Sequence, residues 1–131
     1  MNFVDGDVLE EPVDVDRVLP AQAQRGALAE AVVDALAALH RADVDAIGLG
    51  DLARRDAYLG RQLKRWHGQW EKSKTRELAT MEKVHEALVA GMPEQRYTGV
   101  VHGDYGLGKM LARADGASAG VLDWALCSLG D

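Results

Sequence analysis

The segment HGDYGLGKM, residues 102–110, decides how this chain is interpreted, together with the later segment VLDW, residues 121–124. Each segment contains an aspartate, Asp104 in the first and Asp123 in the second, placed after a short apolar run. Two carboxylates held in this way are what kinase-type phosphoryl transfer needs, one to orient a hydroxyl nucleophile and one to hold a magnesium ion. The pair therefore points to phosphoryl-transfer chemistry, although Lys109 stands where such a site needs a neutral oxygen ligand.

The first segment also fits a second motif, the phosphate loop G-x-x-x-x-G-K, through Gly103, Gly108 and Lys109. Three observations oppose this interpretation. Met110 replaces the Ser or Thr that would bind magnesium, and Asp104 would place a negative charge inside a phosphate cradle. A phosphate loop also requires a helix to begin at the lysine, whereas the following residues contain a turn signal and predict strand, turn, strand. The kinase-type loop is therefore the preferred interpretation.

Upstream of these segments, apolar residues recur at helical spacing. The predicted helices cover residues 21–42, residues 56–74, and a stretch that follows Thr75 and ends at Gly91 and Pro93. Thr75 is expected to cap the last of these helices with its hydroxyl. In the second helix, Trp66 and Trp70 fall on the apolar stripe, and both are predicted to be core residues.

The two ends of the chain have a different pattern. The start suggests an extended entry with a turn at Asp5-Gly6, followed by an acidic connector between Pro12 and Pro20. After the helices, β-prone or apolar runs cover residues 97–101, 110–112 and 120–122, with a hairpin turn at Asp115-Gly116. Helices first and a small hairpin last indicate an α+β fold with the chemistry at its β end.

Composition limits the class of protein. A chain of 131 residues supports one core, and a net charge of −6 argues against a general nucleic-acid binder. Residues 54–77 carry eight basic and three acidic residues, which favours a solvated helix face over an anion-binding patch. The lone Cys127 excludes an internal disulfide, and no apolar run is long enough to span a membrane. We therefore expect a cytoplasmic protein with neither nucleic-acid nor membrane partners.

The residues quoted so far resemble the aminoglycoside phosphotransferase and choline kinase-like family. Its signature is H-G-D, four residues, N, then a hairpin and an aspartate in a context such as L-D-W; His102, Gly103, Asp104 and Asp123 match it. The resemblance extends to the opening MNFVDGDVL, which is similar to the family's hinge, and to ALAALHRADVDAIGLGDL, similar to a helix and loop of its larger lobe. RQLKRWHGQWEKSKTREL resembles a subgroup found beside acyl-CoA dehydrogenases.

The resemblance implies a mostly helical C-terminal lobe of a kinase-like fold, with a small hairpin carrying the catalytic loop and with the N-terminal lobe absent from residues 1–131. Its expected parts are a hinge-like segment at 1–11, a helical region at 12–95, and the catalytic loop and metal-binding hairpin at 96–131. The implied reaction is ATP-dependent phosphorylation of a small-molecule hydroxyl. The sequence does not select the acceptor.

The family's site residues carry over by position. Asp104 is expected to act as the base toward the substrate hydroxyl, and His102 to support the loop. Asp123 is expected to hold Mg²⁺, and backbone groups around Asn2, Phe3 and Val4 are expected to face the adenine of ATP.

One substitution departs from the signature. Lys109 aligns with the family's asparagine and offers only donors and a positive charge where a metal needs an oxygen. We therefore expect impaired magnesium binding, an incomplete nucleotide pocket, and weak or no activity. One route to activity remains, in which the ammonium itself neutralises phosphate charge. The alternatives are a non-catalytic pseudokinase-like binding module and a truncated gene product. A homodimer or a complementing chain is the hypothesis for what covers the surfaces left open.

Overall fold

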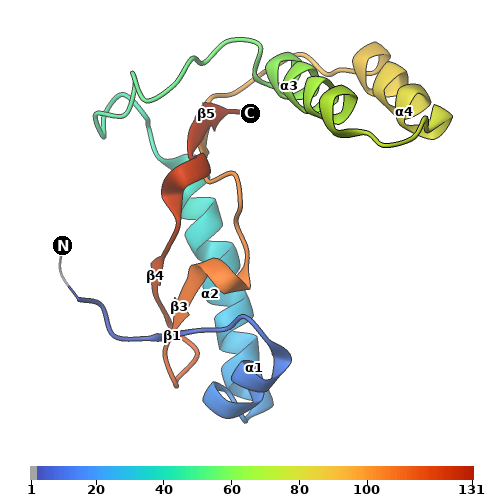
Figure 1. Ribbon diagram of the computed structural model, residues 1–131. Coiled ribbons are helices and arrows are strands. Elements are labelled where there is room, and N and C mark those ends of the chain that lie inside the picture. Colours follow the sequence, from blue (N-terminus) through green and yellow to red (C-terminus); the bar gives the residue numbers. More distant parts are fainter. Residues whose placement is uncertain (1–2) are drawn as a thin grey trace.

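The computed structural model describes residues 3–131, which form four helices and short strands and confirm the predicted α+β class (Figure 1). The elements are β1 (Asp7–Val8), α1 (Pro12–Val18), α2 (Gln22–Arg41), α3 (Tyr58–Ser73), α4 (Ala79–Ala90), β2 (Gly99–Val101), β3 (Met110–Ala112), β4 (Ser118–Val121) and β5 (Ser128–Gly130). Single 3-10 turns at Leu107–Lys109 and Trp124–Leu126 lie in the connections between the last strands.

The strands form two antiparallel sheets, and the chain passes from one sheet to the other more than once. β1, β3 and β4 make one sheet in that order, so the N-terminal strand lies against the hairpin. β2 and β5 make the other sheet, with Val100 opposite Leu129. The chain therefore passes from the second sheet to the first between β2 and β3, and returns between β4 and β5. These two connections contain Asp104 and Asp123, and the sheet pairing places them side by side.

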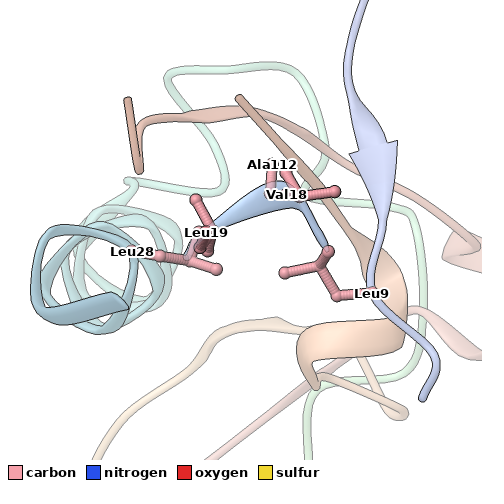
Figure 2. Packing of buried hydrophobic residues seen from close by; sticks show 5 residues of the cluster. All are labelled: Leu9, Val18, Leu19, Leu28 and Ala112. Atoms are coloured by element: carbon pink, nitrogen blue, oxygen red, sulfur yellow. The ribbon is translucent and has the colours of Figure 1, made fainter. Parts of the chain in front are cut away.

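Helix α2 supports both sheets (Figure 1). One buried cluster consists of Leu9, Val18, Leu19, Leu28 and Ala112 (Figure 2). The other consists of Val44, Val100 and Leu129, with Leu39, Ala53 and Cys127 packed against it. Because Leu28 and Leu39 lie on the same helix, α2 contributes to both clusters. Burial of such apolar side chains stabilises the fold by about 1.5 to 3 kcal/mol each.

The predicted acidic connector is wrong, because residues 12–18 form helix α1. Pro12 occupies the first helical turn, where its missing N–H costs nothing. The backbone N–H of Glu11, the N-cap residue, donates to Asp14 Oδ2 at 3.0 Å, so this N–H has a hydrogen-bond partner at the start of the helix. Val18 is buried in the first cluster, whereas the acidic side chains of this helix lie on its outer side. The acidic composition of this segment suggested a connector, although its residues form a short helix with one buried face.

Helices α3 and α4 form where the sequence predicted helices, but the predicted cap of α4 and the predicted burial of two tryptophans on α3 are wrong. Helix α4 begins at Ala79 with Leu78 at its N-cap, so Thr75 does not cap it. Trp66 is 54% exposed and Trp70 only half-buried, so the predicted core role is wrong. The helical hairpin formed by α3 and α4 projects from the rest of the fold, with α3 in contact with β5 (Figure 1). Its apolar stripe lines a groove between the two helices. Periodicity identified an apolar face without identifying what covers it.

None of the helices within residues 3–131 combines the length and the apolar character that a membrane crossing requires.

Candidate active site

Lys109 joins the two aspartate loops. Its Nζ lies 2.6 Å from Oδ2 of Asp123 and 3.4 Å from Oδ2 of Asp104. The backbone of the same residue adds a further link, because Leu122 N–H donates to the carbonyl of Lys109 at 2.7 Å. The three side chains are only partly buried, with 31% of Lys109, 46% of Asp123 and 58% of Asp104 exposed. The structure therefore brings the two aspartates of the predicted site together around one lysine.

His102 lies beneath this site and is 1% exposed. Its Nδ1 accepts the backbone N–H of Asp104 at 3.3 Å, so the proton is on Nε2, which donates to the carbonyl of Leu122 at 2.8 Å. One imidazole thus holds the backbone beside both aspartates. Its ring also contacts the rings of Tyr105 and Trp124, with centroids 5.7 and 4.7 Å away. This is the arrangement that the predicted loop-support role requires, and the role itself remains a prediction.

Two further contacts fix the loops to the rest of the fold. The hydroxyl of Tyr105 donates to the carbonyl of Val32 at 2.6 Å, which anchors the first loop to α2. The indole Nε1 of Trp124 donates to the carbonyl of Val121 at 3.0 Å, which closes the second loop. Sequence reasoning missed both anchors, because a lone tyrosine in a loop carries no periodic signal that identifies its partner.

Asp123 adopts an unusual backbone conformation. Its φ is 61° and its ψ is 65°, in the left-handed region that costs a non-glycine residue free energy. Gly103, in the other loop, has a φ of 88°, which glycine adopts readily. A carboxylate held in a strained conformation at the junction of two sheets is a feature often found at functional sites.

The charges at the site stabilise one another. The hydrogen bond from Lys109 lowers the pKa of Asp123 below its ordinary value. The pKa of Lys109 is raised, first by its hydrogen bond with Asp123 and then by that with Asp104. At neutral pH Asp123 is therefore a carboxylate and Lys109 an ammonium.

This donor set does not fit a magnesium ion. Mg²⁺ requires oxygen ligands at about 2.0 to 2.1 Å. Here an ammonium already lies within ion-pair distance of both carboxylates, and position 109 supplies no oxygen from its side chain. The ammonium of Lys109 pairs with both carboxylates and would repel a divalent cation brought close to them.

The Lys109–Asp123 pair makes a testable pH prediction. Replacing Lys109 by Met removes the hydrogen bond that lowers the pKa of Asp123, so that pKa is expected to rise toward the ordinary carboxyl value. Because the pKa is lower in the folded state, the pair stabilises the protein above the ordinary carboxyl pKa. That contribution is lost as the pH falls through the lowered pKa. Carboxyl-detected NMR titration of both proteins measures the shift, and an unchanged Asp123 pKa would contradict the ion pair.

The alternative phosphate-loop interpretation is wrong. The residues Leu107–Lys109 form a single 3-10 turn, and strand β3 begins at Met110. A phosphate loop requires a helix to begin there, whose N–H groups point at the phosphates. Lys109 therefore pairs with Asp104 and Asp123.

The predicted nucleotide-facing residues lie before β1. Phe3 and Val4 belong to an exposed segment without regular secondary structure, and Asn2 lies outside the described residues. Their contact with adenine remains a prediction.

Two aspartate loops at the junction of short sheets, supported by a helical body, define the C-terminal lobe of a kinase-like phosphotransferase. The model of the Phosphotransferase enzyme family matches residues 1–131, and the chain belongs to that family. This confirms the resemblance drawn from His102, Asp104 and Asp123.

Known proteins agree with this assignment. The chain is similar to the crystal structure of a provisionally assigned aminoglycoside phosphotransferase from Ralstonia eutropha JMP134, with a TM-score of 0.87 and 34% identity over 99% of this chain and 40% of that one. Macrolide 2'-phosphotransferase type I shares the fold, with a TM-score of 0.63 and 21% identity over 84% of this chain and 36% of that one.

Among curated proteins, the chain is 33% identical to Probable acyl-CoA dehydrogenase IBR3 of Arabidopsis thaliana, over 100% of this chain and 17% of that protein. It is 31% identical to Acyl-CoA dehydrogenase family member 10 of Mus musculus, over 82% of this chain and 10% of that protein. The chain thus spans less than a fifth of the length of these relatives. The subgroup resemblance is confirmed.

Proposed function

We propose that this chain carries the catalytic-loop region of a small-molecule kinase, for which the family reaction is transfer of the γ-phosphate of ATP to a hydroxyl. We propose further that the reaction is weak or abolished in this chain. The observation that carries the second proposal is the position of Lys109, whose ammonium pairs with both Asp104 and Asp123.

The argument for low activity rests on geometry and charge. A general base must be within hydrogen-bond reach of the substrate hydroxyl and free to accept its proton. Asp104 instead faces an ammonium at 3.4 Å, and Oδ2 of Asp123 accepts a hydrogen bond of 2.6 Å from the same group. Phosphoryl transfer depends on positioning and on charge stabilisation, with little covalent chemistry supplied by the protein. A displaced metal therefore removes much of what the site has to contribute.

The test is a turnover assay on the purified chain with ATP, Mg²⁺ and a panel of hydroxyl acceptors that includes an aminoglycoside, choline and a sugar. We expect no phosphorylated product above that of the Asp104→Asn variant. Product formation that disappears in Asp104→Asn would overturn the proposal of inactivity while supporting the family reaction.

The same ion-pair geometry favours a second candidate, a pseudokinase-like binding module. Lys109 neutralises the carboxylate of Asp123, so the two loops are held together without a bound metal. Binding of a fluorescent ATP analogue without turnover would favour this candidate. Absence of both binding and turnover would leave the chain without the nucleotide function of its family.

We propose no acceptor more specific than a small molecule with a hydroxyl group. The likeness to the macrolide enzyme, at 21% identity, concerns the fold alone. A fold of this kind serves many substrates, so the acceptor panel in the assay spans different chemical classes.

A further inference from the structure

A second cluster of ligand-type side chains lies on the helical hairpin, away from the aspartate loops. His67 and Glu71 are four positions apart on α3 and therefore share one face of that helix. Glu82 extends from α4, and its Oε2 lies 3.0 Å from Nε2 of His67. One ligand atom from each of the three residues lies within 4.8 Å of the other two. We propose that His67, Glu71 and Glu82 bind a divalent transition metal ion of the Zn²⁺ type, which joins α3 to α4.

The donor set indicates which ions suit the site. One imidazole nitrogen and two carboxylate oxygens are the ligands that Zn²⁺ accepts in proteins, whereas Mg²⁺ and Ca²⁺ prefer oxygen alone. Ligand atoms arranged tetrahedrally around Zn²⁺ at about 2.0 to 2.2 Å are separated by about 3.3 to 3.6 Å. Closing the cluster from 4.8 Å therefore needs only small side-chain rotations. Water completes the coordination at this partly open site.

The surroundings orient the ligands in advance. The ring of His67 stacks on that of His85, with centroids 3.8 Å apart and planes 13° from parallel, which limits its rotation. The groove beside them is lined by apolar side chains, namely Leu63, Trp66, Trp70, Met81, Val84 and Leu88. Apolar surroundings strengthen the attraction between a cation and its ligands.

Lys74 competes with the metal for one ligand. Its Nζ lies 3.0 Å from Oε1 of Glu71 and 3.0 Å from Oε2 of Glu77. A metal that takes Glu71 must share this carboxylate with the ammonium or displace it, and Glu77 keeps Lys74 paired in either case. The lysine therefore weakens metal binding without abolishing it, and its removal is expected to tighten binding.

Calorimetric titration of the purified chain with Zn²⁺ tests the proposal. We expect one ion per chain, with affinity at least tenfold weaker in His67→Ala. The matched control is His40→Ala, an exposed histidine on α2, which is expected to leave the affinity unchanged. Absence of Zn²⁺ binding in the unaltered chain, or equal affinity in His67→Ala, would overturn the proposal.

The Lys74→Ala variant separates a lost ligand from a misfolded protein, because it predicts a gain. Removal of the ammonium is expected to tighten Zn²⁺ binding several-fold. Its control is Glu77→Gln, which removes the other partner of Lys74 and is expected to leave Zn²⁺ affinity unchanged or lower. Unchanged or weaker binding in Lys74→Ala would contradict a site that includes Glu71.

Discussion

Gly103→Ala is expected to destabilise the protein by about 3 to 5 kcal/mol, because strain and overlap act together at this position. Its φ of 88° is unfavourable for alanine. An added Cβ would lie 2.5 Å from the carbonyl oxygen of Leu126 and 2.8 Å from its Cβ. Neither atom is the flexible end of a side chain, so the backbone of the second loop has to move. Urea unfolding followed by circular dichroism measures the loss.

Gly106→Ala is the matched control, since it lies in the same loop. The φ of Gly106 is −178°, which any residue adopts, and an added Cβ there has no neighbour within 4 Å. We expect this variant to remain within about 0.5 kcal/mol of the original stability. Similar losses in the two variants would show that the loop responds to any added side chain, against the specific contact with Leu126.

Lys109→Asn is expected to create affinity for a divalent metal at the aspartate loops. The ammonium and a doubly charged ion about 4 Å apart repel by about 2 kcal/mol even in the dielectric of water. That energy corresponds to a factor of about 30 in affinity. Asparagine also supplies the carbonyl oxygen that lysine lacks. We expect Mn²⁺, followed by electron paramagnetic resonance as a probe for Mg²⁺, to bind at least about tenfold more tightly than to the unaltered chain.

Two companion variants define the cause. Lys109→Met removes the charge without adding an oxygen ligand, so its Mn²⁺ affinity is expected to fall between those of the other two proteins. Adding Asp123→Asn to Lys109→Asn is expected to abolish the gain, because one of the two carboxylates is then neutral. A gain that survives the loss of Asp123 would place the metal elsewhere and contradict the interpretation of the loops.

Much of the fold follows from local patterns in the sequence. The boundaries of α2 and β3 and the turn at Asp115-Gly116 agree closely with the sequence prediction, whereas β4 begins two residues earlier than predicted. Local patterns failed where a partner distant in sequence decides the outcome. Strand β5 is short, and its existence depends on pairing with β2. Helix α1 depends on burying Val18 against α2 and β3, which its acidic composition does not suggest.

The sequence names candidate site residues, but it does not reveal the contacts that they make in the folded chain. The resemblance names Asp104 and Asp123 as candidate site residues, and the structure brings both of them to Lys109. Spacing alone does not reveal that the side chain of Lys109 reaches both carboxylates, because a lysine has many rotamers and only the folded loops select one. The resemblance showed that Lys109 replaces the asparagine of the family signature. The ion pairs show that this lysine contacts both carboxylates in the folded chain.

The position of α2 in both buried clusters also determines where this chain tolerates interruption. A cut or an insertion within Gln22–Arg41 would separate Leu28 from Leu39 and divide the support of both sheets. The turn between α3 and α4 joins neither cluster, so a break or an added domain there would leave the aspartate loops assembled. The turn between α3 and α4 is thus a suitable place to attach a label or a second protein without disturbing the aspartate loops.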